Sequence, residues 1–136
     1  MNLDQEKKNL QAVLANLDER IAPLKEMVLQ TTNFELDYKL RSIKYIELIL
    51  KQLDPKIEDH IEIQIDAALY IGETVRLETG GIWTIESDND NGNYGQPCVF
   101  SNAIAVKRFY PLIDMRTFMK APEIGFFMGL WQLENE

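Results

Sequence analysis

Carboxylates are the residues of this chain whose spacing is most suited to chemistry or binding. Glu58, Glu62, Asp66 and Glu73 recur at helical spacing, which places them on one side of a predicted helix, bordered by Tyr70. Like charges one helical turn apart repel one another, and few lysines or arginines lie near them in the sequence. This acidic ridge is either a solvated helix face or a surface for a basic partner.

A second acidic segment contains Asp88 and Asp90 and consists of turn-forming residues. Aligning Gly92 with the glycine of a calcium-binding loop puts Ser87 at the first ligand position and Cys98 where a bidentate glutamate belongs. The EF-hand pattern therefore fails. We interpret the segment as a mobile hairpin loop, with a calcium site as the minor alternative.

Residues for catalysis or metal binding are scarce. The single histidine, His60, and the single cysteine, Cys98, form neither a four-ligand zinc site nor an internal disulfide. The phosphate-binding loop, the nucleophile elbow and the zinc-protease helix are all missing from the sequence. Glu73 and Glu86 supply the two carboxylates of an acid–base pair, but nothing in the sequence positions them. We therefore expect no enzyme, no cofactor and no metal.

Length and charge restrict the class of protein. A chain of 136 residues has the usual size of one domain, here residues 1–136. Its 22 acidic and 14 basic residues give a net charge of −8, which disfavours nucleic acid and favours a basic partner. The N-terminus lacks the apolar core of a signal peptide, and no apolar run approaches the roughly 18 residues of a membrane span. We expect a cytoplasmic protein that binds no membrane.

The elements that hold these residues follow from hydrophobic periodicity. Leucines seven positions apart, from Leu3 to Leu24, predict an N-terminal helix that Pro23 kinks or breaks near residues 20–22. The heptads are typical either of a helix packed along its own domain or of a coiled-coil dimer. We expect the first, and hence a monomer, with a dimer as the alternative. A second helix is predicted over 34–53, with an N-cap at Thr32 or Asn33.

The third predicted helix, 56–79, carries the acidic ridge. Asp54 is its expected N-cap and Pro55 its first residue. A glycine inside a helix costs roughly 1 kcal/mol relative to alanine, so Gly72 is interpreted as a point where another element approaches closely. Gly72 lies in the expected core face, which consists of Ile57, Ile61, Ile65, Ala68, Gly72 and Val75.

The remaining elements are short. Strands are predicted over 82–86 and 97–101, with a third strand or an extended connector over 103–109. Helices follow over 112–119 and 123–133, and the last is rich in aromatic residues. The sequence thus predicts an α+β fold with about three N-terminal helices, a small antiparallel hairpin or three-stranded sheet, and one or two short C-terminal helices.

The block from Tyr70 to Pro111 resembles a loose group of small, mostly uncharacterised bacterial domains. The shared pattern is an apolar-Gly-Glu helix end, a Gly-Gly-x-Trp strand start, a polar hairpin, a return strand led by proline and a later apolar-Pro pair. The matching positions are Gly72, Glu73, Gly80, Gly81, Trp83, Pro97 and Pro111. Some members of the group are suspected immunity proteins, so the resemblance implies neutralisation of a toxin.

Two functions fit these observations. The first is a non-catalytic protein-binding domain, most concretely a cytosolic immunity protein that covers a basic toxin. The second is a structural or regulatory module that self-associates through its N-terminal heptad helix or its C-terminal aromatic helix. For the first, the expected contact residues are Glu62, Asp66, Tyr70, Glu73, Asp88 and Asp90.

Overall fold

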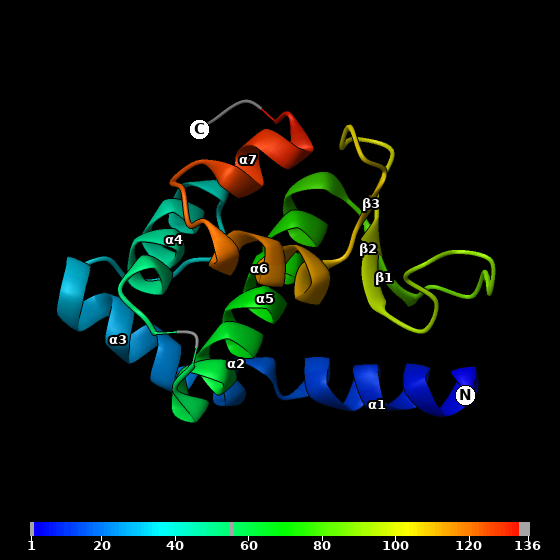
Figure 1. The fold of residues 1–136 in the computed structure, drawn as a ribbon, viewed down its shortest axis with the longest axis horizontal. Coiled ribbons are helices and arrows are strands. Elements are labelled where there is room, and N and C mark those ends of the chain that lie inside the picture. The colour runs from blue at the N-terminus through cyan, green and yellow to red at the C-terminus, as the bar shows by residue number, and fades with distance from the viewer. Residues whose placement is uncertain (1, 55, 134–136) are drawn as a thin grey trace.

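A computed structural model describes residues 2–54 and 56–133 of the chain (Figure 1). Within these ranges, seven α-helices and a three-stranded antiparallel sheet confirm the predicted α+β class. Pro55, the expected first residue of the third helix, lies outside the described residues. Among the described helices, none is long and apolar enough to cross a membrane.

The predicted N-terminal helix breaks twice. It forms α1 (Leu3–Ala15), α2 (Leu17–Arg20) and α3 (Ala22–Thr32). The break before α3 lies where it was predicted, because Pro23 is tolerated only in the first turn of a helix. The break at Asn16 was not predicted. Four heptad residues are buried in the core, namely Leu17, Ile21, Leu24 and Val28.

The second helix begins later than predicted, because Thr32 and Asn33 end α3 instead of starting the next helix. Asn33 has a left-handed backbone (φ 60°), and its N–H donates to the carbonyl of Leu29. The hydroxyl of Thr32 accepts the N–H of Phe34. The chain then continues without helix through residues 34–39 into a 3₁₀ turn, η1 (Leu40–Ser42), and α4 (Ile43–Lys51).

Helix α5 (Glu58–Thr79) is the central element and contacts α2, α3, α4, α6 and β2. Asp54 does not cap it; its carboxylate accepts the N–H of Lys56, and Ile57 is the N-cap residue. The expected core face is wrong at its start, because Ile57 and Ile61 are exposed. The N-terminal part of α5 therefore extends beyond the core that surrounds its second half.

A small sheet follows α5 after Gly80, whose left-handed backbone (φ 71°) ends the helix. Its strands are β1 (Ile82–Ile85), β2 (Pro97–Phe100) and β3 (Arg108–Phe109), in the order β1-β2-β3. Trp83 pairs with Val99, and Val99 pairs with Phe109. The third strand is only two residues long, shorter than the predicted 103–109.

Two helices, α6 (Pro111–Lys120) and α7 (Phe126–Trp131), complete the fold. Figure 1 shows α6 crossing α5, with α7 above it. The aromatic rings of α7 lie in the core, where Phe127 and Trp131 are fully buried. The centroids of the Phe109 and Trp131 rings are 5.1 Å apart, in an edge-to-face arrangement. The aromatic C-terminal helix thus packs inside its own domain.

Gly72 is the point where α5, β1 and α6 meet. A Cβ atom at this position would lie 2.3 Å from Cη2 of Trp83 and 2.9 Å from Cγ of Pro111. Both distances are shorter than real Cβ contacts allow. The interpretation of Gly72 as a site of close approach is confirmed.

Asp114 is expected to make the stability of the fold depend on pH. Burial raises the pKa of this carboxyl from 3.8 to about 6, although a backbone hydrogen bond at Tyr110 lowers it in part. Between these two values the unfolded chain loses a proton that the folded chain keeps, so the contribution of Asp114 to stability falls as the pH rises. We expect Asp114→Asn to raise the melting temperature at pH 7 by roughly 4 °C.

Melting curves of both proteins across this pH range check the prediction. The difference between variant and wild type is expected to vanish near pH 3.8, to grow with pH and to level off above about pH 6. A difference that is the same at every pH would contradict the assignment to this carboxyl.

Candidate functional site

The acidic ridge is not a continuous surface, because Arg20 of α2 neutralises part of it. Nε of Arg20 lies 2.9 Å from Oδ1 of Asp66, and Nη2 lies 3.6 Å from Oε2 of Glu62. Asp66 is buried and Glu62 is exposed. Burial raises the pKa of Asp66, and the hydrogen bond from Arg20 opposes this effect. Asp66 thus joins α2 to α5, which corrects the expectation that basic neighbours are scarce.

Tyr70 is fully buried and presents no surface to a partner. Its ring stacks on the ring of Tyr38, with centroids 4.7 Å apart. Its hydroxyl oxygen accepts the backbone N–H of Tyr38 at 2.8 Å and lies 2.7 Å from Oγ of Ser42. Tyr70 therefore supports Tyr38 from inside the core.

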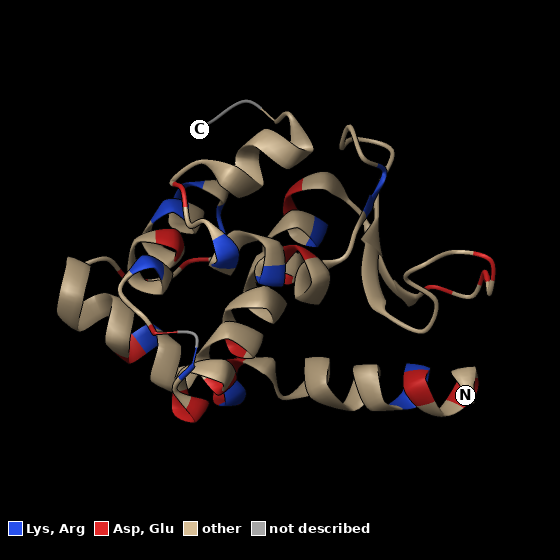
Figure 2. Cartoon of the chain, viewed as in Figure 1, with Lys and Arg blue, Asp and Glu red and all other residues tan. Residues whose placement is uncertain are grey.

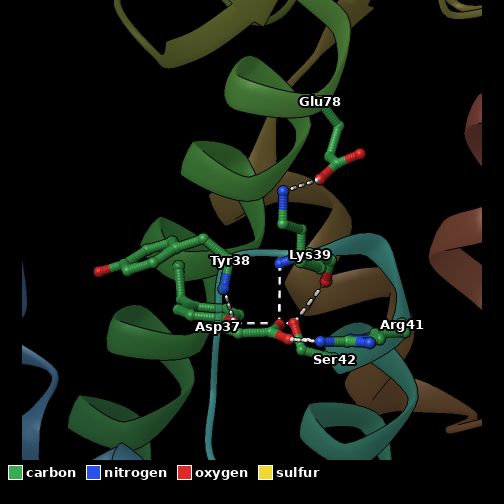
Figure 3. A network of polar contacts seen from close by, with 7 residues as sticks. Asp37, Tyr38, Lys39, Arg41, Ser42 and Glu78 are labelled. Carbon is green, nitrogen blue, oxygen red and sulfur yellow. Dashed lines mark hydrogen bonds and ion pairs between the residues drawn. The ribbon is translucent and has the colours of Figure 1, made fainter.

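Tyr38 has a left-handed backbone (φ 57°), which is rare for an aromatic residue. The loop around it is held by several bonds, which Figure 3 shows. Asp37 accepts the N–H of Lys39 at 3.0 Å and pairs with Arg41 at 2.7 Å. Ser42 donates to the carbonyl of Lys39. These contacts fix a conformation that costs roughly 1–3 kcal/mol, and such strained residues cluster at functional sites.

A pocket of about 290 Å³ lies beside Tyr38, and we call it the acidic pocket. Three carboxylates line it, two from α2 and one from α5. The apolar part of its wall comes mainly from the end of α1 and from α5. Its lining residues are Leu14, Ala15, Asn16, Leu17, Asp18, Glu19, Tyr38, Glu73 and Leu77.

Asp18 stays ionised at neutral pH. The hydroxyl of Tyr38 donates to Oδ1 of Asp18 at 2.6 Å, and Nζ of Lys25 lies 3.1 Å from the same oxygen. These two hydrogen bonds hold the pKa of Asp18 below its ordinary value. The Lys25 ammonium also lies 5.6 Å from the centroid of the Tyr38 ring, so the site already holds one cation of the same chain.

Glu73 is the second ionised carboxylate of the pocket. Arg76 donates to it at 2.6 and 2.8 Å, and Nε1 of Trp83 donates at 3.0 Å. Burial raises the pKa of Glu73, but the bonds from Arg76 and Trp83 outweigh burial and leave the pKa below its ordinary value. Because its charge has these partners and is half-buried, Glu73 is a weaker attraction for an external cation than the exposed Glu19.

The hairpin loop between β1 and β2 is the second acidic surface. Asp88 and Asp90 are exposed there, and Figure 2 shows the acidic residues on this loop. Glu86 anchors the loop: it accepts the hydroxyl of Tyr110 at 2.5 Å, the N–H of Asp88 at 3.2 Å and the amide of Asn91 at 3.3 Å. The bond from Tyr110 holds the pKa of Glu86 below its ordinary value.

The remaining candidates for chemistry are placed as follows. Glu73 and Glu86 each bond to a separate set of partners. Cys98 is fully buried, and burial raises the pKa of its thiol to about 11. Nδ1 of His60 lies 3.1 Å from the carbonyl oxygen of Asp54. In the described part of the chain, no three His, Cys, Asp or Glu residues are grouped to hold a metal ion.

The structure divides the six predicted contact residues into three classes. Glu62, Asp88 and Asp90 are exposed, Glu73 is half-buried in the wall of the acidic pocket, and Asp66 and Tyr70 are buried. Asp18, Glu19 and Tyr38 were not predicted as site residues from the sequence; their only signal was an adjacent acidic pair just before the Pro23 break. Comparisons with protein-family models, curated proteins and solved structures found no match to this chain.

Proposed function

We propose that this chain is a non-catalytic protein-binding domain for a basic partner, and more specifically a cytosolic immunity protein that neutralises a basic bacterial toxin. The observation that carries the proposal is the acidic pocket, where carboxylates meet beside a tyrosine held in a strained conformation. The toxin as partner rests on the resemblance of residues 70–111 to small bacterial domains.

The chemistry of the pocket suits a lysine or arginine side chain of a partner. Asp18 and Glu19 are exposed carboxylates, and the Tyr38 ring beside them already interacts with the Lys25 ammonium. A net charge of −8 would speed the approach of a basic protein. Tyr38 replaces the buried Tyr70 as the proposed aromatic contact residue.

Most of the residues that the alternative, self-association, would use are buried in the described part of the chain. The heptad residues Leu17 and Leu24 and the aromatic residues Phe127 and Trp131 are all buried within the chain. Their apolar surface is therefore not free for a second copy. We accordingly expect a monomer at micromolar concentration, which light scattering measures directly.

Charge-removing variants test the proposal on the partner recovered from the native cell. Asp18→Asn with Glu19→Gln alters the pocket, and Asp88→Asn with Asp90→Asn alters the loop. Because charged rims mainly speed association, the pocket variant is expected to associate with the purified partner about tenfold more slowly, with a weaker dependence on salt. Stopped-flow kinetics at low and high salt measure both effects.

The matched control is Glu35→Gln with Glu123→Gln, which removes the same charge from exposed positions outside the pocket and the loop. It is expected to bind nearly as wild type, and melting curves establish that each variant is folded. A partner that is itself acidic, or equal association rates for all three variants at both salts, would contradict the proposal.

A further inference from the structure

We propose that α1 is a strap that opens independently of the rest of the domain, with its hinge at Asn16. Opening removes one wall of the acidic pocket, because Leu14 and Ala15 of α1 line it. The consequence for partner binding rests on the proposed function. The opening itself does not, because it follows from how α1 is attached.

Apolar attachment of α1 is sparse. Of its 13 residues, the structure buries only Leu10, which is 8% exposed and lies outside the main core cluster, while Val13 and Leu14 are partly buried against that cluster. By contrast, the 11 residues of α3 bury Leu24 and Val28 completely. Segments with few buried apolar contacts open at a lower free energy than the core.

The side-chain hydrogen bonds of α1 lie within the helix and at its own ends. Asn2 caps it by accepting the N–H of Gln5, and Gln5 donates to Asn9 within the helix. Asn16 donates back to the carbonyl of Ala12. Within residues 2–54 and 56–133, no ion pair or side-chain hydrogen bond joins α1 to another helix or to the sheet.

Two open pockets, each of about 200 Å³, lie between α1 and the neighbouring elements of the domain. One lies between Leu10 and Val13 of α1 and Leu69, Ile85 and Leu112 of other elements. The other lies between the same helix and the side chains of Trp83 and Thr84. Atoms that face a gap lose dispersion contacts, so these pockets leave the contact between α1 and the rest of the domain incompletely packed.

The hinge position follows from what holds α2. Asn16 separates α1 from α2 with a non-helical backbone (φ −116°, ψ 25°). Directly after it, Leu17 is buried in the core and Arg20 is bonded to Asp66. Figure 1 shows α1 extending away from α2 along one side of the fold. Motion is therefore confined to the chain before Asn16, while α2 stays in place.

Hydrogen exchange of the isolated protein, resolved by segment, tests the strap. In wild type, amides of 3–15 are expected to exchange at least about a hundredfold faster than those of 66–75 in α5, after correction for intrinsic rates. Leu10→Ala is expected to speed exchange of α1 by about tenfold or more and to leave 66–75 unchanged. The matched control, Leu24→Ala, is expected to speed exchange of the whole domain, because Leu24 belongs to the core.

Trp83 supplies a second measurement. It lies opposite α1, whereas the other tryptophan, Trp131, is fully buried. Acrylamide is expected to quench the fluorescence of Trp83 more strongly in Leu10→Ala than in wild type at the same temperature. Equal protection of α1 and α5 in wild type, or a Leu10→Ala variant that speeds both equally, would overturn the strap.

These results are independent of the binding assay. Fast exchange of α1 together with unaltered partner binding by the charge variants would leave the strap standing and remove the proposed function. Slow exchange of α1, together with the expected slower association of the pocket variant, would remove the strap and leave the proposed function standing.

Discussion

Gly72→Val is expected to lower the free energy of unfolding by about 3 kcal/mol, because overpacking forces rigid neighbours apart. The added side chain would begin 2.3 Å from the Trp83 ring, which also donates to Glu73 and is therefore held in place. On the other side lies the ring of Pro111. Urea denaturation followed by circular dichroism measures the change.

Gly129→Ala is the matched control, since a Cβ at this helical position meets nothing within 4 Å. It is expected to be neutral or to stabilise α7 by up to about 1 kcal/mol, the difference in helix propensity between the two residues. If Gly72→Val unfolds at the same urea concentration as wild type, the close approach of Trp83 to α5 is contradicted.

Glu47→Ala is expected to destabilise the domain by about 3 kcal/mol, because it leaves a buried backbone donor, the N–H of Phe127, without its partner. Glu47 lies in α4 and is 1% exposed. Its carboxylate accepts the N–H of Gly125 at 3.0 Å and of Phe127 at 3.3 Å, so it caps α7 from another helix. Burial raises the pKa of Glu47, and these backbone hydrogen bonds oppose the rise without cancelling it.

Glu47→Gln separates the cap from the charge. Glutamine retains one acceptor oxygen, so it is expected to lose less stability than alanine does. Thermal melting with hydrogen exchange at residues 125–131 follows both effects. A Glu47→Ala variant in which these amides stay protected and the melting temperature is unchanged would show that α7 does not need this cap.

Local patterns in the sequence predicted the elements whose ends depend on neighbouring residues. Gly80 ends α5 through its own backbone, and Pro23 starts a helix because of its own ring. The helix predicted over 34–53 is absent over 34–39 for the opposite reason. The N–H of Tyr38 bonds to Tyr70, which lies 32 positions away, so a tertiary contact outweighs the helical periodicity.

The candidate site was predicted less well than the fold. The sequence indicated an acidic surface on α5, but Arg20 reaches Asp66 across 46 positions and removes part of it. The capping of α7 by Glu47 spans 78 positions and has no local signal. Ion pairs and caps between distant segments depend on how helices pack, and hydrophobic periodicity contains no information about them.

The corner at Gly72 gives the Gly-Glu and Gly-Gly-x-Trp segments of this chain a physical meaning. Gly72 leaves a notch in the helix, the Trp83 ring fills it, and the indole N–H bonds to the next helix residue, Glu73. Three residues of the pattern thus act as one lock between a helix and the strand that follows it. Such a lock specifies an angle between two elements and is independent of what the surface binds.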